Sequence, residues 1–148
     1  MEEYNTIEKV KELFNNAGCV GNENCYFVAY KDFQKSSGMV NGMEYPYHAL
    51  LINQTENGLG IFYLNPEKFS FKVDLAKLKV STDTYNFIKN EDIKSIEIKN
   101  WAIFNSKTKR ITIKLNNKKI HRLYANINEK LISYQTENLT KFIEKNSK

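Results

Sequence analysis

The chain has 148 residues, of which 41% are hydrophobic and 13% aromatic, and its formal net charge is +5. This composition excludes a disordered chain, and the length is that of one domain that can fold without a metal ion or a disulfide framework. The longest apolar run, residues 49–52, is too short to span a membrane, and the first residues lack a signal-peptide pattern. We therefore expect a single cytoplasmic domain over 1–148.

The charges are distributed unevenly. Residues 1–66 carry four Lys and eight acidic residues, whereas residues 67–148 carry 18 basic and nine acidic residues. The basic residues are nearly all Lys, with only Arg110 and Arg122 as exceptions. Because Lys reads base edges poorly compared with Arg, this composition argues against a nucleic-acid partner.

The first segment has the pattern of a helix. Asn5 and Glu8 have the spacing of a capping box, and Gly18 suits the position just past a helix end. The apolar residues between them recur at helical spacing: Ile7, Val10, Leu13 and Phe14. Residues 25–33 are rich in aromatic and β-branched side chains and predict a strand, and residues 34–43 predict a loop.

A hairpin is predicted next. Residues 47–53 are apolar on both faces, so this strand should be covered on both sides. Asn57-Gly58, within a turn over 55–58, is a strong hairpin signal, and residues 59–64 form the returning strand. The following short segments are predicted in turn: a half-buried strand over 69–73, a helical turn or strand over 75–80, a loop over 81–84, a strand over 85–88 and a turn over 90–92.

The alternation of apolar residues breaks near residue 100. Ile96 and Ile98 occupy even positions, whereas Trp101 and Ile103 occupy odd ones. A straight strand cannot place both pairs on one face, so we expect a bulge near residues 99–100.

A turn over 106–108 then precedes the clearest strand, 111–115. Its apolar residues meet those of the returning strand only if 115 pairs with 119 and 111 pairs with 123. That register requires a three-residue loop with Asn117 or Lys118 near the left-handed conformation.

The chain ends in a second predicted helix, which begins at Asn128 or Ser133. Apolar residues line one side of it: Leu131, Ile132, Leu139, Phe142 and Ile143. Gln135 and Asn138 interrupt this stripe. We expect the helix to close one end of a bent sheet, with Phe142 in the core.

In this order of elements the chain resembles the bacterial PH-like domains, a family with a pleckstrin-homology-type barrel. The segments that carry the resemblance are YHALLIN (47–53), GIFY (60–63), FIKNEDIKSIEI (87–98), KRITIKL (109–115) and ENLTKFI (137–143). The resemblance implies a mainly β (α+β) fold: a PH-like barrel of about seven antiparallel strands over 45–148, capped by the C-terminal helix. Residues 1–44 would add an N-terminal helix and a strand.

The resemblance implies no catalytic residues and no cofactor. We therefore expect a non-enzymatic interaction module that binds a protein partner or a second copy of itself. Eukaryotic relatives of the fold often bind phosphoinositides through basic residues in an early hairpin. Here the matching hairpin, 55–58, carries Glu56 and no basic residue.

The residues capable of chemistry are few. We expect the only two histidines, His48 and His121, to be core or edge residues, because neither has neighbours at metal-ligand spacing. The only cysteines, Cys19 and Cys25, suggest reduced thiols, with a local disulfide as the alternative. A nucleophilic Cys25 beside His48 and a carboxylate pair at Glu91-Asp92 are further hypotheses, and no motif supports either.

One basic cluster lies on a single predicted hairpin. Its members are Lys107, Lys109, Arg110, Lys114, Lys118, Lys119 and Arg122. The cluster is either a solubilising outer face or a site for an anion or a partner, and the alternative function is binding of an acidic membrane surface or nucleic acid through residues 107–122.

Overall fold

The computed structural model describes residues 1–19, 21–32, 47–68 and 73–147. Within them, seven antiparallel strands form one open sheet: β1 (Asn24–Lys31), β2 (Ala49–Thr55), β3 (Gly58–Pro66), β4 (Leu78–Lys89), β5 (Ile93–Ala102), β6 (Asn105–Leu115) and β7 (Ile120–Asn126). The strand order is β4-β3-β2-β1-β7-β6-β5. The edge strands β4 and β5 are therefore neighbours in the chain, joined by the short 3₁₀ helix η2 (Asn90–Asp92). The expected mainly β fold is confirmed.

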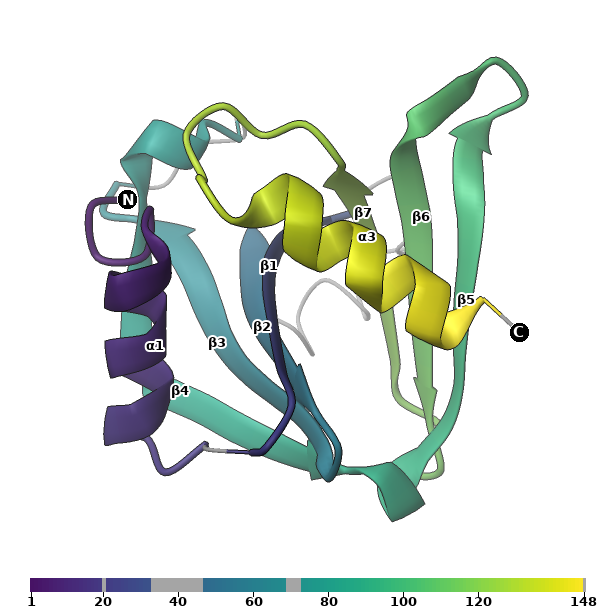
Figure 1. Ribbon diagram of the computed structural model, residues 1–148, viewed down its shortest axis with the longest axis horizontal. Coiled ribbons are helices and arrows are strands. Elements are labelled where there is room, and N and C mark those ends of the chain that lie inside the picture. Colours follow the sequence, from purple (N-terminus) through teal and green to yellow (C-terminus); the bar gives the residue numbers. More distant parts are fainter. Residues whose placement is uncertain (20, 33–46, 69–72, 148) are drawn as a thin grey trace.

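The sheet bends where β1 meets β7. Only two residue pairs join these strands, Tyr30 with Tyr124 and Lys31 with Leu123. The C-terminal helix α3 (Gln135–Asn146) lies across the opening between the two halves of the sheet and contacts β1 and β5 (Figure 1). Phe142 of α3 is fully buried, and its ring centroid is 4.4 Å from that of Phe27. The expected C-terminal helix is confirmed, with its start at Gln135 rather than at Asn128 or Ser133.

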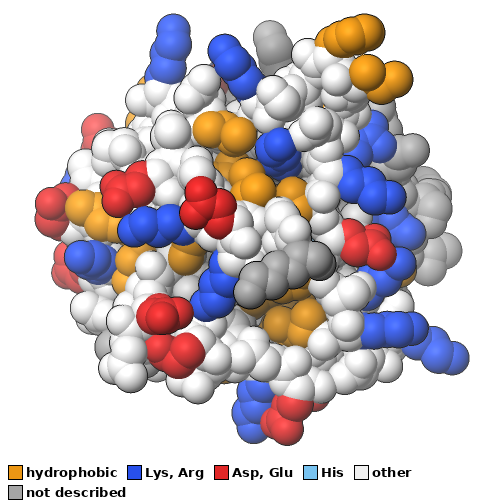
Figure 2. All heavy atoms as spheres, turned by 45° about the vertical axis from the view of Figure 1, so that its right-hand side comes forward, with side chains coloured by type: hydrophobic (Ala, Val, Ile, Leu, Met, Phe, Trp, Pro, Cys, Tyr) orange, Lys and Arg blue, Asp and Glu red, His pale blue; other side chains and the backbone are white. Residues whose placement is uncertain are grey.

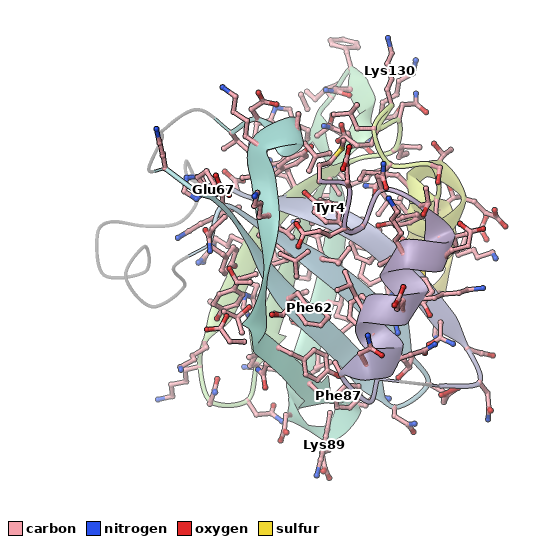
Figure 3. All side chains as sticks on the ribbon, turned by 90° about the vertical axis from the view of Figure 1, so that its left-hand side faces the viewer. Tyr4, Phe62, Glu67, Phe87, Lys89 and Lys130 are labelled. Atoms are coloured by element: carbon pink, nitrogen blue, oxygen red, sulfur yellow. The ribbon has the colours of Figure 1, made fainter. Side chains whose placement is uncertain are left out.

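The strands β1, β2 and β3 are covered on both faces, whereas the edge strand β4 is covered only in part. The inner face packs against α3 and the half of the sheet formed by β5, β6 and β7. The outer face packs against the N-terminal helix α1 (Ile7–Asn16), where Phe14 lies 5.0 Å from Phe62, centroid to centroid. Figure 3 shows this α1 side, with Phe62 and Phe87 on the covered face. Every residue of β2 is buried, which confirms the strand expected to be covered on both sides.

Several local predictions are confirmed. Gly18 has φ +81° just past α1, and β2 and β3 form the hairpin expected at 55–58. Ile111 pairs with Leu123, and the Leu115 amide donates to the Lys119 carbonyl, so three residues form the loop. Lys118 has φ +73°, as this register requires.

The start of α1 differs from the prediction. Thr6, not Asn5, is the N-cap residue, and its hydroxyl accepts a hydrogen bond from the Lys9 amide at 3.4 Å. The Asn5 carbonyl instead accepts from the amide and hydroxyl of Ser133. Asn5 therefore ties the N-terminus to the segment before α3.

Two predicted segments, a loop and a turn, are strands in the structure. Residues 81–84 are not a loop: they belong to β4, at a register shift opposite Ile61 and Tyr63. The Thr84 hydroxyl accepts from the Tyr63 amide at 3.0 Å, so a side chain replaces a backbone acceptor there. Residues 106–108 are likewise not a turn, because β6 begins at Asn105 and the chain reverses at residues 103–104.

The other short segments follow the prediction in part. Residues 75–80 combine both alternatives, since the 3₁₀ helix η1 (Leu75–Lys77) leads into β4 at Leu78. Residues 85–88 are the end of β4. The predicted loop at 34–43 and most of the predicted strand at 69–73 lie outside the described residues.

Candidate functional site

The predicted basic cluster does not form one patch. Three of its members, Arg110, Lys114 and Arg122, lie on the outer face of β6 and β7, opposite the core-facing Ile111 and Leu123. Lys118 and Lys119 lie at the loop that joins the two strands. Lys107 and Lys109 lie toward the other end of the hairpin, and the Lys109 ammonium donates to the Asn100 side chain. Figure 2 shows Lys and Arg side chains spread along this side of the molecule rather than gathered at one point.

A cluster that the sequence pattern did not reveal crosses the same outer face. Trp101 lies 5.3 Å from Tyr124, and Tyr124 stacks on Tyr30 at 5.1 Å, centroid to centroid. The Arg110 guanidinium lies over the Trp101 ring, 4.3 Å from its centroid. We call these four residues the aromatic ladder. Its members come from β5, β6, β7 and β1, which are four adjacent strands of the sheet.

Arg110 is the polar member of the ladder. Among the described residues no carboxylate forms an ion pair with it, and its buried Nε has no hydrogen-bond partner. Stacking on Trp101 holds the guanidinium plane in place. A guanidinium held in this way can bind a carboxylate through two parallel hydrogen bonds.

A surface groove lies beside the ladder. It has a volume of about 410 Å³ and is lined by Lys31, Asp32, Trp101, Asn105, Thr108, Tyr124 and Asn126. A smaller hollow of about 180 Å³ adjoins it through the shared Asp32 and includes Lys99, Arg110 and Arg122. An aromatic wall with polar groups at the rim is typical of a surface that accepts side chains of another molecule.

The tyrosines of the ladder remain neutral. Burial, followed by the charge of Glu129, raises the pKa of Tyr30, and its hydroxyl donates to the Glu129 carboxylate at 2.8 Å. Burial is also the main cause that raises the pKa of Tyr124. The ladder therefore offers aromatic surface and one cation, and no group that exchanges protons near neutral pH.

The histidines are core and edge residues, as predicted. His121 is buried, and its Nδ1 lies 2.9 Å from the Tyr47 hydroxyl. Burial, with a smaller effect of Lys119, lowers the pKa of His121 to about 4. The His48 ring lies 3.2 Å from the Asn65 side chain at the entrance to β2.

The remaining chemical hypotheses find no geometric support. Both cysteines are buried thiols, as the first alternative predicted, and burial raises the pKa of Cys25 to about 11. Cys25 pairs with Gln54, at the opposite end of β2 from His48, so the two do not meet. Glu91 and Asp92 lie exposed in η2 and form part of a turn.

Within residues 1–19, 21–32, 47–68 and 73–147, no group of three or more His, Cys, Asp or Glu side chains could hold a metal ion. No helix in this part of the chain is both long and apolar enough to cross a membrane. No protein-family model, curated protein or solved structure matches the chain. Its function must therefore be inferred from its own residues.

Proposed function

We propose that this chain is a non-enzymatic interaction module on a PH-like scaffold, and that it binds a protein partner through the aromatic ladder. The strand order, in which the chain-adjacent β4 and β5 are the two edges, supports a PH-like barrel. The helix α3 across the opening of the sheet supports it further. We also propose a cytoplasmic location, which two buried, unpaired thiols favour.

The aromatic ladder carries the functional proposal. Trp, Tyr and Arg are the residue types that contribute most of the binding energy at protein interfaces. Here Trp101 and Tyr124 line a groove of about 410 Å³, Arg110 lies over the Trp101 ring in the adjoining hollow, and the buried Tyr30 stacks on Tyr124. The guanidinium of Arg110, which forms no ion pair with any described carboxylate, adds a preference for a partner that presents a carboxylate next to an apolar side chain.

The chemical groups of the site favour binding over catalysis. The thiol of Cys25 stays protonated near neutral pH, and the ring of His121 is buried among core side chains. The ladder itself supplies neither a nucleophile nor a general base. A rigid sheet surface with aromatic anchors is suited to hold a partner, because its side chains lose little entropy on binding.

The test compares the immobilised wild-type chain with two variants in its capacity to retain proteins from the host lysate. The binding variant is Arg110→Ala with Tyr124→Ala, and the control is Lys118→Ala at the far loop. We expect wild type and control to retain the same protein and the binding variant to bind it about thirtyfold more weakly. The proposal fails if all three retain the same set of proteins.

Self-association is measured on the same three proteins by light scattering over a range of concentrations. A dimer that the binding variant abolishes would identify a second copy as the partner. Strictly monomeric wild type that also retains nothing from the lysate would refute an interaction module.

A further inference from the structure

The turn between β5 and β6 exposes two large hydrophobic side chains. Ile103 is 90% exposed and Phe104 is 98% exposed, and among the described residues only Leu131, at 43%, joins them as an exposed large hydrophobic residue. We call Ile103 and Phe104 the β5–β6 tip. Because Ala102 pairs with Asn105, the tip residues are the two-residue turn itself. Burial of large apolar side chains is favourable, so the almost complete exposure of two adjacent ones indicates a contact surface.

The tip projects beyond the rest of the molecule. In Figure 1 the β5–β6 hairpin extends above the sheet and above α3. In Figure 2 hydrophobic side chains stand clear of the body at its upper margin, with Lys and Arg side chains close by. The apolar surface is therefore convex, and none of the described elements covers it.

The chain segment that carries the tip is basic, and the acidic residues that flank it in the sequence are Glu97 and Glu129. Residues 98–128 contain eight Lys and Arg and no acidic residue. Lys107 is exposed and lies three residues behind Phe104, which corresponds to about 10 Å along an extended strand. Lys130 is exposed at the same end of the molecule (Figure 3). Exposed Lys residues therefore lie behind the tip along the chain, where they can contact lipid headgroups while the apolar side chains enter the boundary of the acyl chains.

From this arrangement we infer that the β5–β6 tip inserts into an anionic lipid surface, with Ile103 and Phe104 below the headgroups and Lys107 and Lys109 among them. A protein partner would need a pocket that matches the convex tip, whereas a fluid lipid layer adapts to the shape of the tip. A second copy of the chain would bring two cationic tips together, which like-charge repulsion opposes. The tip can be tested separately from the aromatic ladder, since the tip variants below leave all four ladder residues unchanged, although the reporter Trp101 belongs to the ladder.

Trp101 provides a direct reporter. It is the only Trp in the chain and lies two residues from Ile103. Its fluorescence should shift to the blue and be quenched by brominated acyl chains when the tip inserts. The measurement uses vesicles of phosphatidylcholine alone and of an equimolar mixture of phosphatidylcholine and phosphatidylserine, at low and at high salt.

Two variants test the two parts of the surface. Ile103→Ser with Phe104→Ser removes the apolar tip, and we expect its binding to the mixed vesicles to weaken at least about tenfold. Lys107→Gln with Lys109→Gln removes two charges near the tip, and about a tenfold loss is expected, confined to low salt. The matched control, Lys118→Gln with Lys119→Gln, removes the same charge at the opposite end of the hairpin and should bind as wild type does.

Three results would overturn the inference. The first is wild type that fails to bind the mixed vesicles at low salt. The second is equal binding by wild type and the serine variant. The third is a dimer, formed without lipid, that the serine variant abolishes, because this would make a second copy the occupant of the tip. If wild type binds the mixed vesicles but retains no protein through the ladder, only the lipid inference is supported. If the ladder variant loses a protein partner and wild type does not bind the vesicles, only the proposed function is supported.

Discussion

The side-chain amide of Gln135 in α3 pairs with both backbone polar groups of Val28 in β1. Its Oε1 accepts from the Val28 amide, and its Nε2 donates to the Val28 carbonyl, each at 2.9 Å. Asn138, one turn later, accepts from the Tyr26 amide at 3.1 Å. β7 pairs with β1 only at residues 30 and 31, so the same edge of β1 has no strand partner at residues 26–28. The side-chain amides of Gln135 and Asn138 bind the backbone at this edge. Helix side chains therefore complete a strand edge inside the molecule.

Replacement of Gln135 by Ala should show how much its hydrogen bonds to the edge of β1 contribute to stability. Gln135 is fully buried, so its loss leaves the amide and carbonyl of Val28 without partners. We expect the free energy of unfolding to fall by about 2 to 3 kcal/mol, measured by urea denaturation. Glu137→Ala, on the exposed side of the same helix, should cost less than about 1 kcal/mol. Equal losses in the two variants would contradict the role of Gln135.

Phe142 links α3 to the core. It is fully buried against Phe27, so Phe142→Ala should lower the free energy of unfolding by about 3 to 5 kcal/mol. Phe142→Asp would bury a carboxylate in the same place, and we expect it to unfold the domain. Lys141→Ala is the neighbouring exposed control. A Phe142→Asp protein with the wild-type melting temperature would exclude Phe142 from the core.

The strand pairings that the sequence predicts well are those set by simple alternation. The register of Ile111 with Leu123 follows from two regular strands that can meet in only one way. Alternation does not predict the face of the sheet on which Trp101 lies, because a register shift between Asn100 and Ala102 decides it. The sequence locates that break to within a residue or two and does not say which face Trp101 takes. The aromatic ladder depends on this one residue and could not be predicted.

Two further features could not be predicted from the sequence pattern, for other reasons. Gln135 and Asn138 interrupt an apolar stripe, and their partners Val28 and Tyr26 are more than 100 residues away in the chain. No local signal can pair residues so far apart. Ile103 and Phe104 are large apolar residues, yet they form an exposed turn. Such a departure from the burial rule is what a binding surface produces.

His121 should make the stability of the domain depend on pH. Burial lowers its pKa from 6.5 to about 4. Above pH 6.5 the ring is therefore neutral in both the folded and the unfolded chain, and its titration does not reduce the free energy of unfolding. As the pH falls from 6.5 to about 4, the unfolded chain binds a proton that the folded chain does not, and stability decreases. The full effect is about 3 kcal/mol, and below the folded pKa it grows no further.

The measurement is the free energy of unfolding of wild type and His121→Gln across this pH range. The Gln amide can still accept from the Tyr47 hydroxyl and carries no titrating group. We expect the stability of wild type to fall relative to that of the variant as the pH drops. Parallel profiles would show that His121 does not titrate on unfolding.

Lys118 should be replaceable by Gly with a gain in stability. Its φ of +73° is the only positive φ of a non-glycine residue in the described part of the chain, and a side chain there costs about 1 kcal/mol. The Lys118 side chain is exposed, so little packing is lost. We expect Lys118→Gly to raise the free energy of unfolding by up to about 1 kcal/mol in urea denaturation, with the unfolded-chain entropy of Gly offsetting part of the gain.

Asn117→Gly is the matched control, because it places the same residue one position earlier in the same loop. Asn117 has no positive φ to relieve, and its side chain accepts a hydrogen bond from the Lys119 amide at 3.0 Å. Gly at this position should therefore lower stability, since it adds chain entropy and removes that bond. If both variants were destabilised to the same extent, the left-handed conformation of Lys118 would not be under strain, and the three-residue loop would owe its shape to the strands it joins.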